Sequence, residues 1–221
     1  ILSMTPSVNI TSDAGNGIGY TGMSIRGSDG SRINVTINGV PLNDSESHAT
    51  YWVDLPDFAS SISSIQIQRG VGTSTNGAGA FGGSINVSTK KQSQAPKFKL
   101  SNSFGSYGTL KNSISFSTGR VGKYFELSGN LSKIYSDGYI DRASSNLKGY
   151  FLQGSYYKER TNIKFIAFGG HERTYQAWYG LDQETLSTNR KFNYAGMYFN
   201  DDGDQFFYDK QEDNYKQDHY Q

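Results

Sequence analysis

The sequence contains no cysteine, only four prolines and three histidines, and no long hydrophobic run. Without cysteine, neither a disulfide nor a zinc–thiolate site can form. The longest uninterrupted apolar run, residues 165–168, is far shorter than the roughly 18 residues that a transmembrane helix needs. A membrane-spanning helix is therefore excluded, whereas a membrane β-barrel is not, because barrel strands alternate apolar and polar residues.

An excess of one charge is also lacking. The chain has 21 Lys and Arg against 20 Asp and Glu, so its net charge of +1 gives no global argument for nucleic-acid binding. No acidic residue lies between Asp57 and Glu126. The basic residues of that stretch occupy alternate strand positions and a linker, which favours a polar barrel lumen and a hinge. No nucleic-acid partner is predicted.

The motifs that would indicate catalysis are incomplete. Residues 77–82 spell G-x-G-x-x-G, but they run into an alternating strand pattern instead of a helix, and no acidic residue follows at the spacing of a dinucleotide site. The segment GHERTYQ begins like the zinc motif H-E-x-x-H, but Tyr175 replaces its second histidine. We therefore predict no catalytic residue, no cofactor and no metal site, and we do not expect an enzyme.

What the chain does contain is glycine and aromatic residues, with 26 Gly, 16 Tyr and 13 Phe, a composition typical of β-proteins. After a linker at 92–97, apolar and polar residues alternate in segments about as long as a tilted bilayer crossing. Strands are predicted near 98–104, 110–118, 124–133, 147–157 and 162–171. An extracellular loop is expected to follow, and to include the acidic segment 201–221, whose net charge is −5 from seven acidic and two basic residues.

Residues 1–91 have a different pattern, with short β segments joined by turns. They contain Arg26-Gly27, the run INGVPL at 37–42, Arg69-Gly70, and Gly82-Gly83 followed by the alternating INV. In this order and approximate spacing, these pieces resemble the plug domain of TonB-dependent outer-membrane transporters, and the style of the sequence is similar to members from Bacteroidetes-type bacteria.

The resemblance implies a mostly β fold, with a mixed α/β plug domain (1–91) inside a large antiparallel transmembrane barrel of about 22 strands. Only the first strands, within 98–221, would be present, and a TonB-binding box would lie upstream of Ile1. The implied location is the bacterial outer membrane. The implied function is active uptake of a scarce nutrient, most often a ferric siderophore or a corrinoid, driven by TonB with its inner-membrane ExbB/ExbD complex.

Two alternatives stay open. Within the family, the barrel could take up a peptide or glycan together with a surface lipoprotein. Outside the family, the chain could be a soluble or adhesive all-β structural protein. The discriminating feature is the apolar strand face, which meets outer-membrane lipid in a barrel and a second sheet in a sandwich.

The resemblance also implies roles for individual residues. Arg26 and Arg69 resemble the arginines that lock the plug to barrel glutamates, and Glu126 is a candidate partner. The glycines expected to let the plug backbone turn sharply and pass close to the wall are Gly27, Gly39, Gly70, Gly77, Gly79, Gly82 and Gly83. The residues expected to face the substrate are His48, Tyr51, Trp52, Thr75, Asn76, Tyr175, Trp178 and Tyr179.

Overall fold

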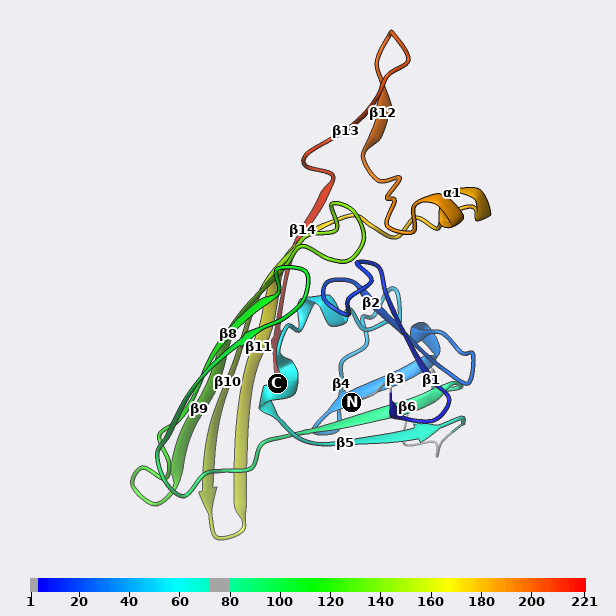
Figure 1. Ribbon diagram of the computed structural model, residues 1–221. Helices are drawn as coiled ribbons and strands as arrows, with labels where there is room; N and C mark the ends of the chain where they lie inside the picture. Colours follow the sequence, from blue (N-terminus) through cyan, green and yellow to red (C-terminus); the bar gives the residue numbers. More distant parts are fainter. Residues whose placement is uncertain (1–3, 72–79) are drawn as a thin grey trace.

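The computed structural model describes residues 4–71 and 80–221. Figure 1 shows a curved wall of long strands, formed by the second half of the chain, with the N-terminal part lying against its inner side. Among the described residues, no helix has the length and apolar character needed to span a membrane.

The N-terminal part is built on a small mixed sheet. Its strand order is β4 (Val40–Pro41), β3 (Ile33–Ile37), β6 (Gly83–Thr89) and β5 (Ile62–Arg69). β3 and β6 are parallel, while the other pairs are antiparallel. A separate hairpin joins β1 (Val8–Ser12) to β2 (Thr21–Ile25), and this part also contains the 3-10 turns η2 (Gly30–Arg32), η3 (Trp52–Asp54) and η4 (Phe58–Ser61).

Two of the expected glycines show why this part needs them. Gly39 follows Asn38 in the β3–β4 turn with φ +89°, a conformation that side chains disfavour. Gly83 lies where β6 meets β5, and a Cβ there would press on the carbonyl oxygen of Gln68. Gly27 and Gly70 also have positive φ, while Gly77 and Gly79 lie outside the described residues.

The wall is a six-stranded antiparallel sheet. Its strands are β7 (Lys97–Phe104), β8 (Leu110–Ser117), β9 (Phe125–Ser136), β10 (Ser145–Lys158), β11 (Thr161–Tyr175) and β14 (Glu212–Tyr220), in the order β14-β11-β10-β9-β8-β7. Short turns join β8 to β9 and β10 to β11 at one end. At the other end, a long loop between β11 and β14 carries α1 (Gln183–Thr188) and the β12–β13 hairpin (Met197–Phe199, Gln205–Phe207).

The two faces of the wall differ in chemistry. The outward face carries large apolar side chains that remain exposed, among them Phe98, Leu100, Phe104, Ile114, Leu127, Leu131, Leu152, Ile163 and Phe165. The inward face is mostly polar, and it adds Phe151 and Phe168 to the hydrophobic core of the N-terminal part, where both contact Phe58. The polar face thus packs against the N-terminal part and the apolar face points away from it, which is the reverse of a soluble sandwich.

The expected extracellular loop after residue 171 is wrong in one respect, because part of it is strand. β11 continues to Tyr175, and β14 pairs with it from Tyr175↔Glu212 to Ala167↔Tyr220. The alternation of apolar and polar residues could not reveal β14, since both of its faces are polar. Its inward residues meet the N-terminal part, and outward residues such as Lys216 and Asp218 pair with each other.

Candidate functional site

A buried ion pair joins the N-terminal part to the wall. Asp57, on the turn before η4, accepts from the ammonium of Lys111 on β8, and its side chain is only 2% exposed. The Ser60 hydroxyl donates to the same carboxylate at 2.6 Å, and the Asn130 amide of β9 donates at 3.2 Å. A desolvated carboxylate needs such partners, so these contacts fix the position of η4 on the wall.

A second set of contacts fixes the end of β6. The hydroxyl of Thr89 donates to Oε1 of Gln153 on β10 at 2.8 Å, and Nε2 of Gln153 donates to the carbonyl of Lys90 at 3.2 Å. Glu126 on β9 accepts from the backbone N–H of Ser93 at 3.0 Å. The segment leaving β6 is therefore tied to the wall before it enters β7.

Two wall glycines allow the backbones to touch. A Cβ on Gly149 would collide with the carbonyl oxygen of Pro56, and one on Gly170 would collide with the carbonyl oxygen of Asp54. Neither glycine has a positive φ, so the requirement is space and not backbone conformation. Residues 54–56 can lie against β10 and β11 because Gly149 and Gly170 have no side chain.

Two buried acidic residues, Asp54 and Glu172, lie at this contact. Asp54 is 3% exposed, and its Oδ1 has no hydrogen-bond partner in the described chain. Burial, and next the charge of Glu172, raise the pKa of Asp54 to about 6. Glu172 is fully buried and accepts from the hydroxyls of Tyr20 at 3.2 Å and of Thr174.

The β1–β2 turn makes further contacts at the long-loop end. The carbonyl of Ala14 accepts from the backbone N–H of Tyr139 at 2.7 Å, and Asn16 donates to the Ser136 hydroxyl at 2.7 Å. The ring of Tyr20 packs edge-on against Trp178, with centroids 6.0 Å apart. This turn thus reaches the loops at the long-loop end of the wall.

The predicted lock between the plug arginines and a barrel glutamate has no partner among the described residues, and it stays a prediction. Nη1 of Arg69 donates to the carbonyl of Pro6 at 3.2 Å, within the N-terminal part. Arg26 lies beside Gly70 and forms no ion pair with any described residue. Glu126 binds Ser93 and Ser117 instead of an arginine. The ion pair that joins the N-terminal part to the wall is Lys111–Asp57.

The predicted substrate-facing residues divide into three groups. Tyr51, Trp178 and Tyr179 are 44%, 46% and 55% exposed and His48 is also exposed, whereas Trp52 packs partly against the core. Tyr175 is only 4% exposed, and its hydroxyl donates to the carbonyl of Tyr208 at 2.7 Å, so in this structure it supports the long loop. Thr75 and Asn76 lie outside the described residues.

Sequence reasoning missed the β1–β2 turn. Its segment DAGNGIGY has three glycines at alternate positions, all with positive φ, and this density was a usable signal. Nothing in the sequence distinguishes Lys111 as a contact of the N-terminal part, because a lysine at a polar position of an alternating strand is equally expected in a water-filled barrel lumen.

No group of three or more His, Asp or Glu in the described residues could hold a metal ion.

Comparison with known proteins explains this arrangement. Residues 1–84 match the family model of the TonB-dependent receptor plug domain. The chain thus carries the plug domain of the TonB-dependent receptors. The N-terminal part is accordingly the plug and the six-stranded wall is a section of the barrel, as the sequence predicted.

Solved structures of this fold are similar over most of the chain. The ferric citrate transporter FecA in its unliganded form gives a TM-score of 0.68 at 17% identity, covering 87% of this chain and 31% of its own. The ferric yersiniabactin uptake receptor FyuA from Yersinia pestis gives 0.63 at 18%, covering 80% and 29%. The copper transporter OprC gives 0.65 at 17%, covering 81% and 29%. Among curated proteins, no sequence matches the chain.

The chain therefore spans about a third or less of the receptors it resembles. Receptors of this family are outer-membrane proteins, which places this chain in the bacterial outer membrane with its apolar strand face toward lipid. The short turns then face the periplasm and the long loop faces the exterior. The similarity to Bacteroidetes-type members stays a prediction.

Proposed function

We propose that the full-length protein takes up a scarce nutrient across the outer membrane, with a ferric siderophore as its cargo. The observation that carries this is the plug seated on the barrel wall through the Asp57–Lys111 pair. Binding and transport of this kind require no covalent chemistry by the protein, so we do not propose an enzyme. TonB, acting with ExbB and ExbD, is the proposed source of the work that moves the plug.

Ferric cargo is supported by the relatives of this fold. FecA is a ferric citrate transporter, FyuA a ferric yersiniabactin receptor, and BauA from Acinetobacter baumannii a ferric preacinetobactin receptor. A corrinoid is the second candidate. Uptake of a peptide or glycan with a surface lipoprotein is the remaining alternative within the family, and no described contact favours it.

The charge of the lumen adds support for an anionic chelate. A space of about 630 Å³ lies between the plug and the wall, and Lys90, Lys91, Lys97 and Lys99 line it. Glu126 is the only acidic residue among its described lining, so the balance is four cations against one anion. A cavity with this balance raises the local concentration of negatively charged solutes.

The proposed binding surface is formed by the exposed ring of Tyr51 on the plug and by the exposed neighbouring rings of Trp178 and Tyr179, whose centroids lie 6.4 Å apart. Exposed rings without a polar partner are suited to stack on the organic part of a chelate. Tyr20 supports Trp178 from below through the edge-on contact of their rings.

The test is equilibrium binding of a panel of purified ferric siderophores and cyanocobalamin to the full-length receptor in detergent. We expect at least one ferric chelate to bind, and Trp178→Ala to weaken it about tenfold or more while Trp178→Phe retains most of the affinity. Tyr124→Ala, an aromatic change at the periplasmic end, is the matched control and should change nothing. Equal binding by Trp178→Ala and the parent would contradict the proposed surface.

A further inference from the structure

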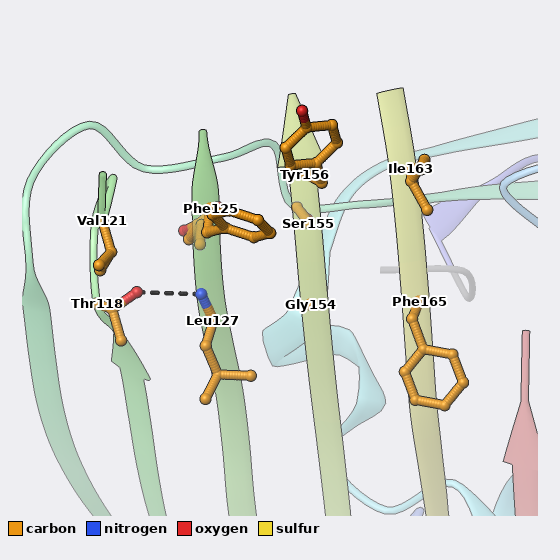
Figure 2. Close-up of a pocket in the computed structure, with 10 residues that line it drawn as sticks. Thr118, Val121, Phe125, Leu127, Gly154, Ser155, Tyr156, Ile163 and Phe165 are labelled. Carbon is orange, nitrogen blue, oxygen red and sulfur yellow. Dashed lines mark hydrogen bonds between the residues drawn. The ribbon is translucent and has the colours of Figure 1, made fainter. Parts of the chain in front are cut away.

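A groove crosses the outward face of the wall near its periplasmic end. On β10, Gly154 stands opposite Leu127 of β9 and Phe165 of β11, so a large side chain flanks it on each side while it has none. A Cβ built on Gly154 would meet nothing within 4 Å. The resulting groove has a volume of about 440 Å³, and Figure 2 shows its lining side chains.

The walls of the groove are apolar. One step nearer the periplasm, Tyr156 lies between Phe125 and Ile163, and its ring centroid is 4.9 Å from that of Phe125. Val121, from the β8–β9 turn, closes the side next to Phe125. These side chains point to the outward face, and all except the more buried Tyr156 are about half exposed. The groove is therefore open to the membrane and offers hydrocarbon a place below the general level of the barrel surface.

The periplasmic rim of the groove is basic. The two turns that bound it, residues 118–124 and 158–161, contain Arg120, Lys123, Lys158 and Arg160 against the single acid Glu159, a balance of +3 from four cations and one anion. The four cationic side chains are exposed, and Nζ of Lys158 lies 5.9 Å from the ring centroid of Tyr124. The other nearby acid, Glu126, points inward and is already bonded to Ser93 and Ser117.

We propose that this groove is a binding site for one anionic diacyl phospholipid of the periplasmic leaflet. One acyl chain lies over Gly154, between Leu127 and Phe165, and the phosphate group lies among Lys123, Lys158 and Arg160. Two features together favour this occupant over a protein partner. The apolar part lies within the band that faces hydrocarbon, and the charge begins where the strands end, at the level of lipid headgroups.

This site differs from the general lipid contact of a barrel. A smooth apolar face has no preference among acyl chains or headgroups, whereas a recess with cations at one end holds one lipid with its head in a defined place. Long basic side chains at a membrane interface can also reach the headgroup while their stems cover apolar surface.

The test uses the full-length receptor in detergent with dioleoyl phosphatidylglycerol or dioleoyl phosphatidylcholine, and native mass spectrometry counts the retained lipid. The parent should retain one phosphatidylglycerol and several-fold less phosphatidylcholine. Gly154→Leu, whose Cβ meets nothing within 4 Å, should fill the groove and lower retention of phosphatidylglycerol several-fold. Lys158→Gln with Arg160→Gln should remove the preference for phosphatidylglycerol.

The matched control is Lys133→Gln with Lys148→Gln, which removes two cations that face each other on β9 and β10 near the external end. This control should keep the parent's preference. A heat-shifted band on an unboiled gel confirms that each variant is folded. Equal retention of the two lipids by the parent would overturn the proposal. So would a folded Gly154→Leu variant that retains phosphatidylglycerol as the parent does, or an equal loss of preference in the control.

Discussion

Replacing Lys111 with methionine should loosen the plug from the barrel wall. The change keeps the length of the side chain and removes the ammonium, so the buried carboxylate of Asp57 is left with only the neutral donors Ser60 and Asn130. Breaking a fully buried ion pair costs about 3–5 kcal/mol. Because the Lys111 side chain is 31% exposed, water replaces part of the lost interaction, and we expect about 2–3 kcal/mol.

The assay is hydrogen exchange with mass spectrometry on the full-length receptor, which reports local opening of the plug. A cost of about 2–3 kcal/mol corresponds to a roughly 30- to 150-fold loss of protection, since about 1.4 kcal/mol is tenfold. The loss should be concentrated in η4 and β5, and the outer strands of the wall should be unaffected. Lys99→Met is the matched control, because Lys99 also lines the lumen and has no salt bridge among the described residues.

A double-mutant cycle separates the ion pair from general effects. Asparagine tolerates the left-handed backbone of Asp57, at φ +57°, so Asp57→Asn removes the charge with little strain. Combined with Lys111→Met, it should cost clearly less than the sum of the single changes, because no unpaired carboxylate remains. Strict additivity, or a Lys111→Met variant that exchanges like Lys99→Met, would show that the ion pair does not hold the plug on the wall.

Three further predictions concern single residues. The pKa of Asp54 is raised to about 6 in the folded plug, against 3.8 in the unfolded chain. The stability that Asp54 contributes is therefore present below pH 3.8 and is lost as the pH rises through about 6. Asp54→Asn should stabilise the plug by up to about 3 kcal/mol at pH 7.5 and by little near pH 4, as measured by urea unfolding at each pH. Gly170→Val should prevent the plug from packing on the wall, because the new Cβ collides with the carbonyl of Asp54. Limited proteolysis should then cut the plug, while the barrel keeps its heat-shifted band. Gly180→Val, where the new Cβ meets nothing within 4 Å, is the control. Tyr175→Phe should leave siderophore affinity unchanged and make the long loop exchange faster, since it removes the hydrogen bond to Tyr208.

Much of the fold could be predicted because its signals are local. Alternation of apolar and polar residues indicated the segments that became β7 to β11, and the order of the Arg-Gly, INGVPL and Gly-Gly pieces indicated the plug. β14 could not be found in this way. Its inward residues meet a polar plug surface and its outward residues pair with neighbours on the sheet, so neither face repeats an apolar pattern.

The site was less predictable because it depends on contacts between distant segments. Asp57 and Lys111 are 54 residues apart, and nothing near either residue distinguishes it from other charged positions. The arginine lock was inferred from resemblance, and the described structure places Arg69 on the plug's own backbone instead. The sequence does not distinguish Tyr175 from Trp178, because both are aromatic residues of the same polar segment. Only the fold shows that the Tyr175 ring is buried under the loop while the Trp178 ring is exposed.

We propose above that the full-length protein imports a ferric chelate in a TonB-dependent way. The most direct measurement is accumulation of radioactive iron, supplied as ferric citrate and as purified ferric siderophores, by cells that express the receptor with and without TonB. We expect at least one chelate to accumulate only when both the receptor and TonB are present. Accumulation that is the same without the receptor, or that persists without TonB, would contradict it.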